Sequence, residues 1–242
     1  LFTDNETGIP VEAHELCDEK AEAEWICKKI RELRNKGASF KDIAILYRVN
    51  ILARSIEEAL VQKNIPYQIL GGLRFYDRKE VKDFLALLRL KANPGDNMAF
   101  QRATAFLKTG VGPTIVERIT RDSEAAGMPV LQFAAEKAPS MKYYKGQGVR
   151  AQQLLKFSQW CKELLQLQDD NLQRLLNKVY EHSAFEDRLH EEYPEVIAKE
   201  RIEHIDMLRG RLHDFIQENE EATLINFLAD VALVSDVDSY VD

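Results

Sequence analysis

In the N-terminal part of the chain, the apolar positions follow two different spacings. The segment 11–17 looks extended, a short apolar run predicts a buried β-strand at residues 42–48, and a third strand is expected at 65–70. Apolar residues that recur every three or four positions predict helices at residues 18–37, 51–64 and 77–93. Strands that alternate with helices indicate a parallel α/β layer.

The expected ends of these elements follow from a few residues. Asp18 is expected to cap the first helix and Gly37 to end it. Asp77 is expected to cap the third helix, and Gly71 and Gly72 to end the third strand. The apolar stripe of the first helix consists of Ala21, Trp25, Ile26, Ile30 and Leu33.

Beyond the segment "NPGDN" (93–97), the spacing predicts only helices, so we expect an all-α domain to follow the α/β layer. The segment 138–148 is the clearest loop, and the acidic tail 234–242 is expected to be extended. No repeat of fixed period is present, which argues against a solenoid. The helices are expected at residues 98–107, 113–126, 129–137, 147–168, 171–183, 195–218 and 221–233.

The stretch "LKTGVGPTIVERI" (107–119) interrupts this helical series. Gly110 and Gly112 can form a tight turn, and Pro113 suits the first turn of the next helix. Backbone N–H groups at that helix start would suit a phosphate, as in a helix-hairpin-helix element that holds a nucleic-acid backbone. A plain turn between two helices explains the same residues, and the spacing alone does not decide between the two.

Composition and charge narrow the class of protein. Hydrophobic residues make up 45% and charged residues 30% of the 242 residues, which is typical of a soluble globular protein. The net charge of −7 weighs against binding nucleic acid by overall charge, so any contact must rest on local patches. No segment predicts a membrane helix or a signal peptide. The three cysteines are expected to be free thiols in the cytoplasm.

Four segments, in this order and spacing, resemble the UvrD/PcrA/Rep family of superfamily 1 DNA helicases, and the resemblance covers essentially the whole chain. They are "DIAILYRVNILARSIEEAL" (42–60), "IPYQILGGLRFYDRKEVKDFLALLRLKANPGDN" (65–97), "FLKTGVG" (106–112) and "FLADVALVSDVD" (227–238). The family has two RecA-like motor domains, 1A and 2A, with inserted helical domains 1B and 2B. The resemblance implies the N-terminal part of 2A at 1–93, domain 2B at 94–234 and a return toward 2A at 235–242.

The resemblance also implies the activity, an ATP-dependent DNA helicase of 3′-to-5′ polarity that uses ATP and Mg²⁺. The phosphate-loop pattern G-x-x-x-x-G-K-[ST] does not occur in this sequence. We therefore expect no catalytic residue, metal site or bound cofactor in this part, and no ATP hydrolysis by it alone. The expected partners are single-stranded DNA, the junction with duplex DNA, and the remaining domains 1A, 1B and the rest of 2A. No membrane partner is expected.

The resemblance suggests contacts with single-stranded DNA at two places. Tyr47, Arg48 and Asn50 lie at the end of the second predicted strand, where α/β sheets place ligands, although Arg48 could instead cap a helix or pair with a carboxylate. Arg74, Phe75 and Lys82 are the candidates in "GGLRFYDRKEVKD" (71–83). Phe75 fits a core position better than a base-stacking one, and Arg78 with Glu80 is expected to form a structural ion pair.

The predicted contact with duplex DNA consists of Lys108, Thr109, Gly110, Val111, Gly112 and Thr114. The family commonly has Pro and Arg where this sequence has Leu107 and Thr109, which removes a positive charge and predicts a weaker contact. Lys142, Lys145 and Arg150 with two tyrosines form a second basic segment, for which a solvated loop is the simpler explanation.

Two other functions remain open. Domain 2B could regulate unwinding or dock a repair or polymerase protein, with little DNA affinity of its own, and the net charge favours this. The chain could also belong to a nuclease-fused relative, although the compact spacing between residues 42 and 97 argues against it.

Overall fold

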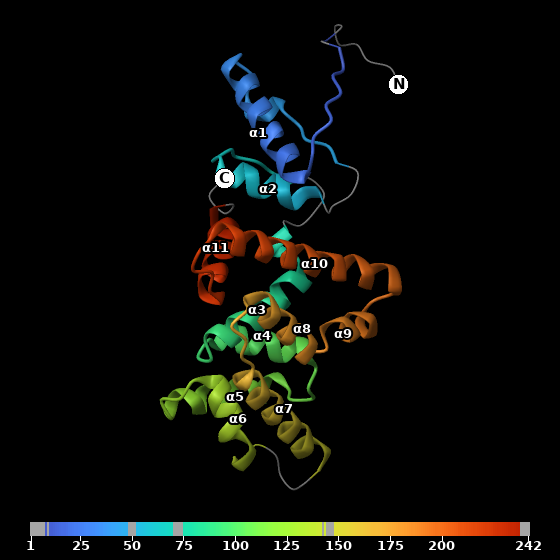
Figure 1. Cartoon of the computed structure of the whole chain (residues 1–242). Coiled ribbons are helices and arrows are strands. Elements are labelled where there is room, and N and C mark those ends of the chain that lie inside the picture. The colour runs from blue at the N-terminus through green and yellow to red at the C-terminus, as the bar shows by residue number, and fades with distance from the viewer. Residues whose placement is uncertain are drawn as a thin grey trace. The chain divides into compact units, whose positions relative to one another are not determined.

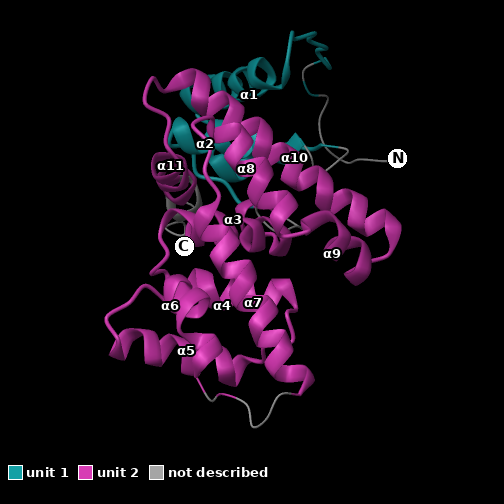
Figure 2. Cartoon of the chain, turned by 60° about the horizontal axis from the view of Figure 1, so that its bottom comes forward, with its two compact units in different colours: residues 1–68, 241 teal, residues 69–240, 242 magenta. Residues whose placement is uncertain are grey.

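The computed structural model describes residues 8, 10–47, 52–69, 75–141, 143 and 148–237, with side chains described up to 233. The chain divides into two compact units, which we call unit 1 and unit 2, with the boundary between Gln68 and Ile69 (Figure 2). This boundary lies before the third predicted helix. The predicted family domains, divided after residue 93, are a separate subdivision and remain a prediction.

Unit 1 is built on two helices, α1 (Glu19–Asn35) and α2 (Ala53–Gln62), with a short 3₁₀ helix η1 (Phe40–Asp42) between them. The predicted end signals of α1 are confirmed. The Asp18 carboxylate accepts a hydrogen bond from the Ala21 amide at 2.7 Å, and Gly37 has φ +99° just beyond the helix. The core is made by Ala23, Cys27, Ile30, Ile56, Ala59, Leu60 and Ile65.

Two extended segments of unit 1, residues 43–47 and 65–68, alternate between covered and exposed side chains. Ile43, Ile45 and Tyr47 pack against the core, whereas Leu46 is 93% exposed. The alternation is the period-two pattern of a β-strand with one covered face.

The described residues contain no β-strand, so the predicted parallel sheet is not shown. Segments 11–17, 43–47 and 65–69 are irregular. A strand is defined by backbone hydrogen bonds to a neighbour, and an apolar run measures only the tendency to be buried. In this structure, one face of the second and third predicted strands packs on the helices of unit 1. Their apolar side chains are thereby covered without the backbone hydrogen bonds of a sheet.

All regular elements among the described residues of unit 2 are helices. Most predicted helices are present within a few residues of their expected bounds. Its elements are η3 (Phe75–Asp77), α3 (Lys79–Ala92), α4 (Asn97–Leu107), α5 (Pro113–Ala125), α6 (Val130–Glu136), η4 (Ala138–Ser140), α7 (Val149–Gln166), α8 (Leu172–His182), α9 (Phe185–Glu192), α10 (Glu195–Glu218) and α11 (Leu224–Val237). Helix α9 has no counterpart in the prediction.

Helix α3 is the centre of unit 2. Val81, Phe84, Leu87 and Leu88 are fully buried, and α3 packs against α4 as well as α8, α10 and α11, which come far later in the chain (Figure 1). Helices α5, α6 and α7 gather at one end of the unit. Segments distant in sequence are thus joined through one apolar helix.

The predicted cap of α3 is wrong. Asp77 lies in η3, and the residue at the cap position is Arg78, whose side chain makes no capping hydrogen bond. The Asp77 carboxylate instead pairs with the Lys82 ammonium group at 2.6 Å. The short 3₁₀ turn ahead of α3 moves the start of the helix by about two residues, and this removes Asp77 from capping reach.

Candidate nucleic-acid interface

The turn between α4 and α5, residues 108–112, is the candidate site with the most complete geometry. Lys108 ends α4 in the left-handed region, with φ 45° and ψ 42°, and Gly110 has φ +78°. The Thr109 hydroxyl accepts a hydrogen bond from the Val111 amide at 3.4 Å. The Val111 side chain is only 7% exposed and anchors the turn in the core. Val111 can therefore contribute its backbone, but not its side chain, to a contact outside.

The other side of the turn opens to solvent at the start of α5. Gly112 is the N-cap residue, and its carbonyl accepts hydrogen bonds from the amides of Ile115 and Val116, at 2.9 and 3.2 Å. Pro113 occupies the first turn, as predicted. Gly112, Pro113 and Thr114 are exposed. The first amides of a helix lack intrahelical acceptors, so this end carries partial positive charge toward solvent.

Helix α7 adds a residue that the sequence did not point to. A Cβ atom at Gly110 would lie 2.3 Å from Cδ of Gln153, so the Gln153 side chain lies directly on the turn. Arg150 is exposed and precedes Gln153 by three residues on α7, which places both on one side of that helix. Of the second basic segment, Lys142 and Lys145 lie outside the described residues.

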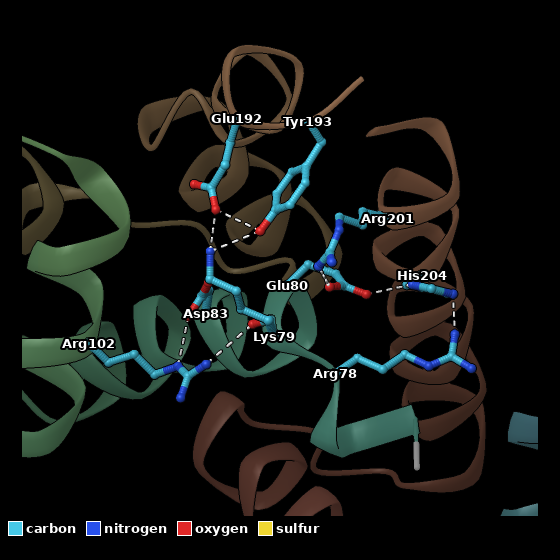
Figure 3. Close-up of polar contacts among 9 residues, drawn as sticks. All are labelled: Arg78, Lys79, Glu80, Asp83, Arg102, Glu192, Tyr193, Arg201 and His204. Atoms are coloured by element: carbon cyan, nitrogen blue, oxygen red, sulfur yellow. Dashed lines mark hydrogen bonds and ion pairs between the residues drawn. The ribbon is translucent and has the colours of Figure 1, made fainter. Parts of the chain in front are cut away.

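Lys108 does not point freely into solvent. Its ammonium group pairs with Oε2 of Glu192, the last residue of α9, at 2.8 Å. Oε1 of the same carboxylate accepts from the Lys79 ammonium group at 2.5 Å and from the Tyr193 hydroxyl at 2.6 Å (Figure 3). One carboxylate thus holds two lysines from two different elements.

The ion pairs at Glu192 shift the pKa of this carboxylate and that of Lys79. Hydrogen bonds from Lys108 and then Lys79 lower the pKa of Glu192 to about 2. Burial alone would lower the pKa of Lys79, but the bonds to Glu192 and Tyr193 outweigh it and raise that pKa. Lys79 and the Glu192 carboxylate are therefore both charged across the neutral pH range.

A second polar cluster joins the start of α3 to α10. The buried Glu80 carboxylate pairs with the Arg201 guanidinium and, at 2.6 Å, with Nδ1 of His204 (Figure 3). Nε2 of His204 contacts the Arg78 guanidinium. Because a guanidinium can only donate, this Nε2 accepts, and the proton of neutral His204 is on Nδ1 and donated to Glu80.

The predicted ion pair between Arg78 and Glu80 is therefore relayed through His204. Burial alone would raise the pKa of Glu80, but the His204 hydrogen bond and the Arg201 charge outweigh it and lower that pKa. A neighbouring carboxylate, Asp83, pairs with Arg102 at 2.8 Å, and there burial dominates and raises the pKa. These contacts tie α3 to α4 and α10 and are structural.

The predicted contacts with single-stranded DNA have different outcomes. Arg48, Asn50 and Arg74 lie outside the described residues. Tyr47 packs half-buried on the core of unit 1, and Lys82 of unit 2 pairs with Asp77. Phe75 is 1% exposed and its ring meets that of Tyr76 edge-on at 4.9 Å, which favours the core interpretation over base stacking.

The described residues form neither a metal site nor a membrane-spanning helix. In the part of the chain that the structure describes, no group of three or more His, Cys, Asp and Glu side chains could hold a metal ion. Among the described helices, none combines the length and the apolar character needed to cross a bilayer.

Comparison with known proteins agrees with the resemblance of the sequence motifs. The family model of the UvrD-like helicase C-terminal domain matches residues 1–242. The ATP-dependent DNA helicase PcrA of Bacillus subtilis (strain 168) is 35% identical over 240 residues, which are 98% of this chain and 32% of that protein. PcrA of Staphylococcus epidermidis (strain ATCC 12228 / FDA PCI 1200) is 33% identical over 242 residues, again 98% and 32%.

A third relative gives the same coverage. PcrA of Staphylococcus aureus (strain NCTC 8325 / PS 47) is 32% identical over 243 residues, 98% of this chain and 32% of that protein. The chain thus spans about a third of the length of these curated relatives. Because the family model covers the whole sequence, the chain belongs to the UvrD-like helicase C-terminal domain family.

Proposed function

We propose that the chain is a DNA-contacting part of an ATP-dependent 3′-to-5′ DNA helicase, and that the turn at residues 108–112 holds duplex DNA through its backbone. In this proposal Lys108, Thr109, Gly110, Gly112 and Thr114 meet the phosphates, with Val111 as the internal anchor. The candidates for the single strand that remain are Tyr47, Arg48, Asn50, Arg74 and Lys82, whereas the buried Phe75 is left to the core. The names of the relatives, all ATP-dependent DNA helicases, support the activity.

The observation that carries the proposal is the exposed start of α5 beside a glycine turn. Pro113 has no N–H and the amides of Ile115 and Val116 donate to the Gly112 carbonyl, so the amides offered to a phosphate are those of the exposed Gly112 and Thr114. An added Cβ at Gly112 would meet nothing within 4 Å. A phosphate can therefore approach the backbone closely there. Gln153 on α7 lies against the same turn, and in this proposal it extends the contact together with the exposed Arg150, three residues earlier on α7. Such a surface positions a duplex without reading its bases.

The test is fluorescence anisotropy of the 242-residue chain with a labelled DNA hairpin that carries a single-stranded tail, and with a plain single strand, at two salt concentrations. Gly112→Val places a branched side chain over the amides in open space, at φ −73°, so the fold tolerates it. Gly210→Val is the matched control, because Gly210 is exposed on α10 and its Cβ also meets nothing within 4 Å. Lys108→Ala removes the nearest charge.

We expect salt-sensitive binding to the hairpin that Gly112→Val and Lys108→Ala weaken and Gly210→Val leaves unchanged. The loss in Gly112→Val should amount to at least tenfold in Kd, about 1.4 kcal/mol. Equal affinity of Gly112→Val and Gly210→Val would remove the turn from the interface.

A second function is favoured by the pairing of Lys108 with Glu192 and by the net charge of −7. Both reduce the attraction for phosphate and fit a regulatory arm, or one that docks a repair or polymerase protein. Absence of binding to either DNA at low salt would support this function over the first.

For the whole protein we propose ATP and Mg²⁺ as cofactors, and domains 1A, 1B and the rest of 2A as the partners of this part. ATP hydrolysis is then expected only when these domains are present. A phosphate-release assay of the chain with DNA, ATP and Mg²⁺ should give no turnover above the buffer, and DNA-stimulated turnover would contradict this expectation.

A further inference from the structure

Outside the predicted DNA contact, the most informative feature is the Glu192 carboxylate, because it already pairs with the lysine of the turn. Lys108 is the positively charged residue of the turn itself, and its ammonium group lies 2.8 Å from Oε2 of Glu192. Lys79 is held by the same carboxylate at 2.5 Å. A DNA phosphate that approaches the turn therefore finds two ammonium groups whose charge is already balanced in part.

The position of Glu192 is fixed by the packing of α9. Phe185 at the start of α9 is 1% exposed and stacks on Phe106 of α4 with ring centroids 4.4 Å apart. Leu189, one turn later, is 3% exposed. Glu192 ends the helix and Tyr193 hydrogen-bonds its carboxylate at 2.6 Å. The anchoring residues lie on the face of α9 toward the core, so Glu192 is held beside α4 by packing as well as by charge.

We propose that Glu192 competes with DNA phosphate for Lys108 and Lys79, and thereby sets how tightly the turn binds duplex DNA. This inference rests on the proposed duplex contact and adds its regulation. A carboxylate and a phosphate oxygen are alternative acceptors for an ammonium group. A DNA phosphate must therefore displace Glu192 from each lysine before it can pair with that lysine. The Glu192 side chain is 26% exposed, which leaves water and a competing anion access to the pair.

The consequence can be measured as a change in salt dependence. Each phosphate that a lysine neutralises steepens the slope of log K against log salt by about 0.9. Removing the carboxylate charge frees Lys108, and also Lys79 if a phosphate reaches it. The affinity of Glu192→Gln for the hairpin DNA should therefore rise, by up to about tenfold at low salt for one freed cation, with a slope steeper by about 0.9.

The control for net charge is Glu191→Gln. Glu191 is the adjacent residue and is exposed, so its variant changes the long-range field of the protein by the same single charge. The double variant Glu192→Gln with Lys108→Gln tests the route, because the part of the gain that Lys108 carries must disappear, and any gain that remains is carried by Lys79. Far-UV circular dichroism and a urea midpoint for each variant identify any change that comes from altered folding.

The outcomes separate this inference from the function beneath it. Tighter binding and a steeper slope in Glu192→Gln alone support it, including the case in which only this variant binds. Equal binding of Glu192→Gln and Glu191→Gln overturns the inference and leaves the duplex contact standing. Weaker binding of Glu192→Gln than of the wild type also overturns it, since Glu192 would then build the surface. Absence of hairpin binding in the wild type and in every variant overturns both.

Discussion

A glycine-to-alanine pair at the turn gives the sharpest test of its geometry. Gly110 has φ +78°, whereas Gly112, two residues later, has φ −73°. An L-residue in the left-handed region costs about 1–2 kcal/mol. The new Cβ in Gly110→Ala would also lie 2.3 Å from the Gln153 side chain, which must leave its rotamer at a cost of about 0.5–1.5 kcal/mol. Gly110→Ala should thus lower the free energy of unfolding by about 2 kcal/mol.

Gly112→Ala should be nearly neutral. Alanine caps a helix less well than glycine, but it also reduces the conformational entropy of the unfolded chain, and both effects are about 0.5 kcal/mol with opposite sign. No atom lies within 4 Å of the new Cβ. The two variants have the same chemistry and differ only in backbone conformation and in the contact with Gln153.

Urea unfolding followed by tryptophan fluorescence provides the assay. The chain has two tryptophans, Trp25 in α1 and Trp160 in α7, so a Trp25→Phe background makes the signal specific to unit 2. With an m-value of about 3 kcal/mol/M, a loss of 2 kcal/mol lowers the midpoint by about 0.7 M. In a Gln153→Ala background the contact with the new Cβ is absent. Gly110→Ala should then lower the free energy of unfolding only by the cost of the left-handed backbone. Equal midpoints for Gly110→Ala and Gly112→Ala would refute the described turn.

Three further predictions address the rest of the chain. Pairing with Lys108 and Lys79 holds the pKa of Glu192 at about 2 instead of 4.5, so its stabilisation is present above pH 4.5 and lost as the pH falls toward 2. The difference in urea midpoint between wild type and Glu192→Gln should accordingly be present at neutral pH and vanish near pH 2; a constant difference would contradict the pairing. Phe185→Ala should cost about 3–5 kcal/mol, because the ring is 1% exposed, whereas Met98→Ala, 83% exposed, should change thermal stability by less than about 0.5 kcal/mol. In a native thiol-labelling assay Cys17 should react at once and the buried Cys27 and Cys161 only on unfolding, since burial raises the pKa of both buried thiols; rapid labelling of all three would contradict the described cores.

Local signals in the sequence predicted the helices well where a cap or a long apolar stripe is present. Asp18, Gly37 and Pro113 have their expected roles, and α10 has the predicted bounds. Helix α9 escaped prediction because only Phe185 and Leu189 give it a helical spacing. It also begins after Ala184, whose φ of 47° no residue preference reveals.

The candidate site needed the three-dimensional structure for a different reason. Glu192 meets Lys79 across 113 positions of sequence, and His204 meets Glu80 across 124. No local pattern carries such pairings, which arise only when α9 and α10 return to α3. The glycine turn was visible in the sequence, but the side chains that surround it, Gln153 and Glu192, were not.

The central position of α3 has a consequence for the order of folding during synthesis. Helices α3 to α7 follow one another and can associate as soon as they have been made, with short loops to close. Glu80 gains Arg201 and His204 more than a hundred residues later, and the buried apolar face of α3 must wait for α10 and α11 as well. In a nascent chain that has passed α7, we expect the face of α3 that later meets α8, α10 and α11 to be uncovered, and transiently exposed apolar surface of this kind is prone to aggregate. Docking of α10 covers this face of α3 and brings Arg201 and His204 to Glu80. We therefore expect it to be the step that completes the core of unit 2.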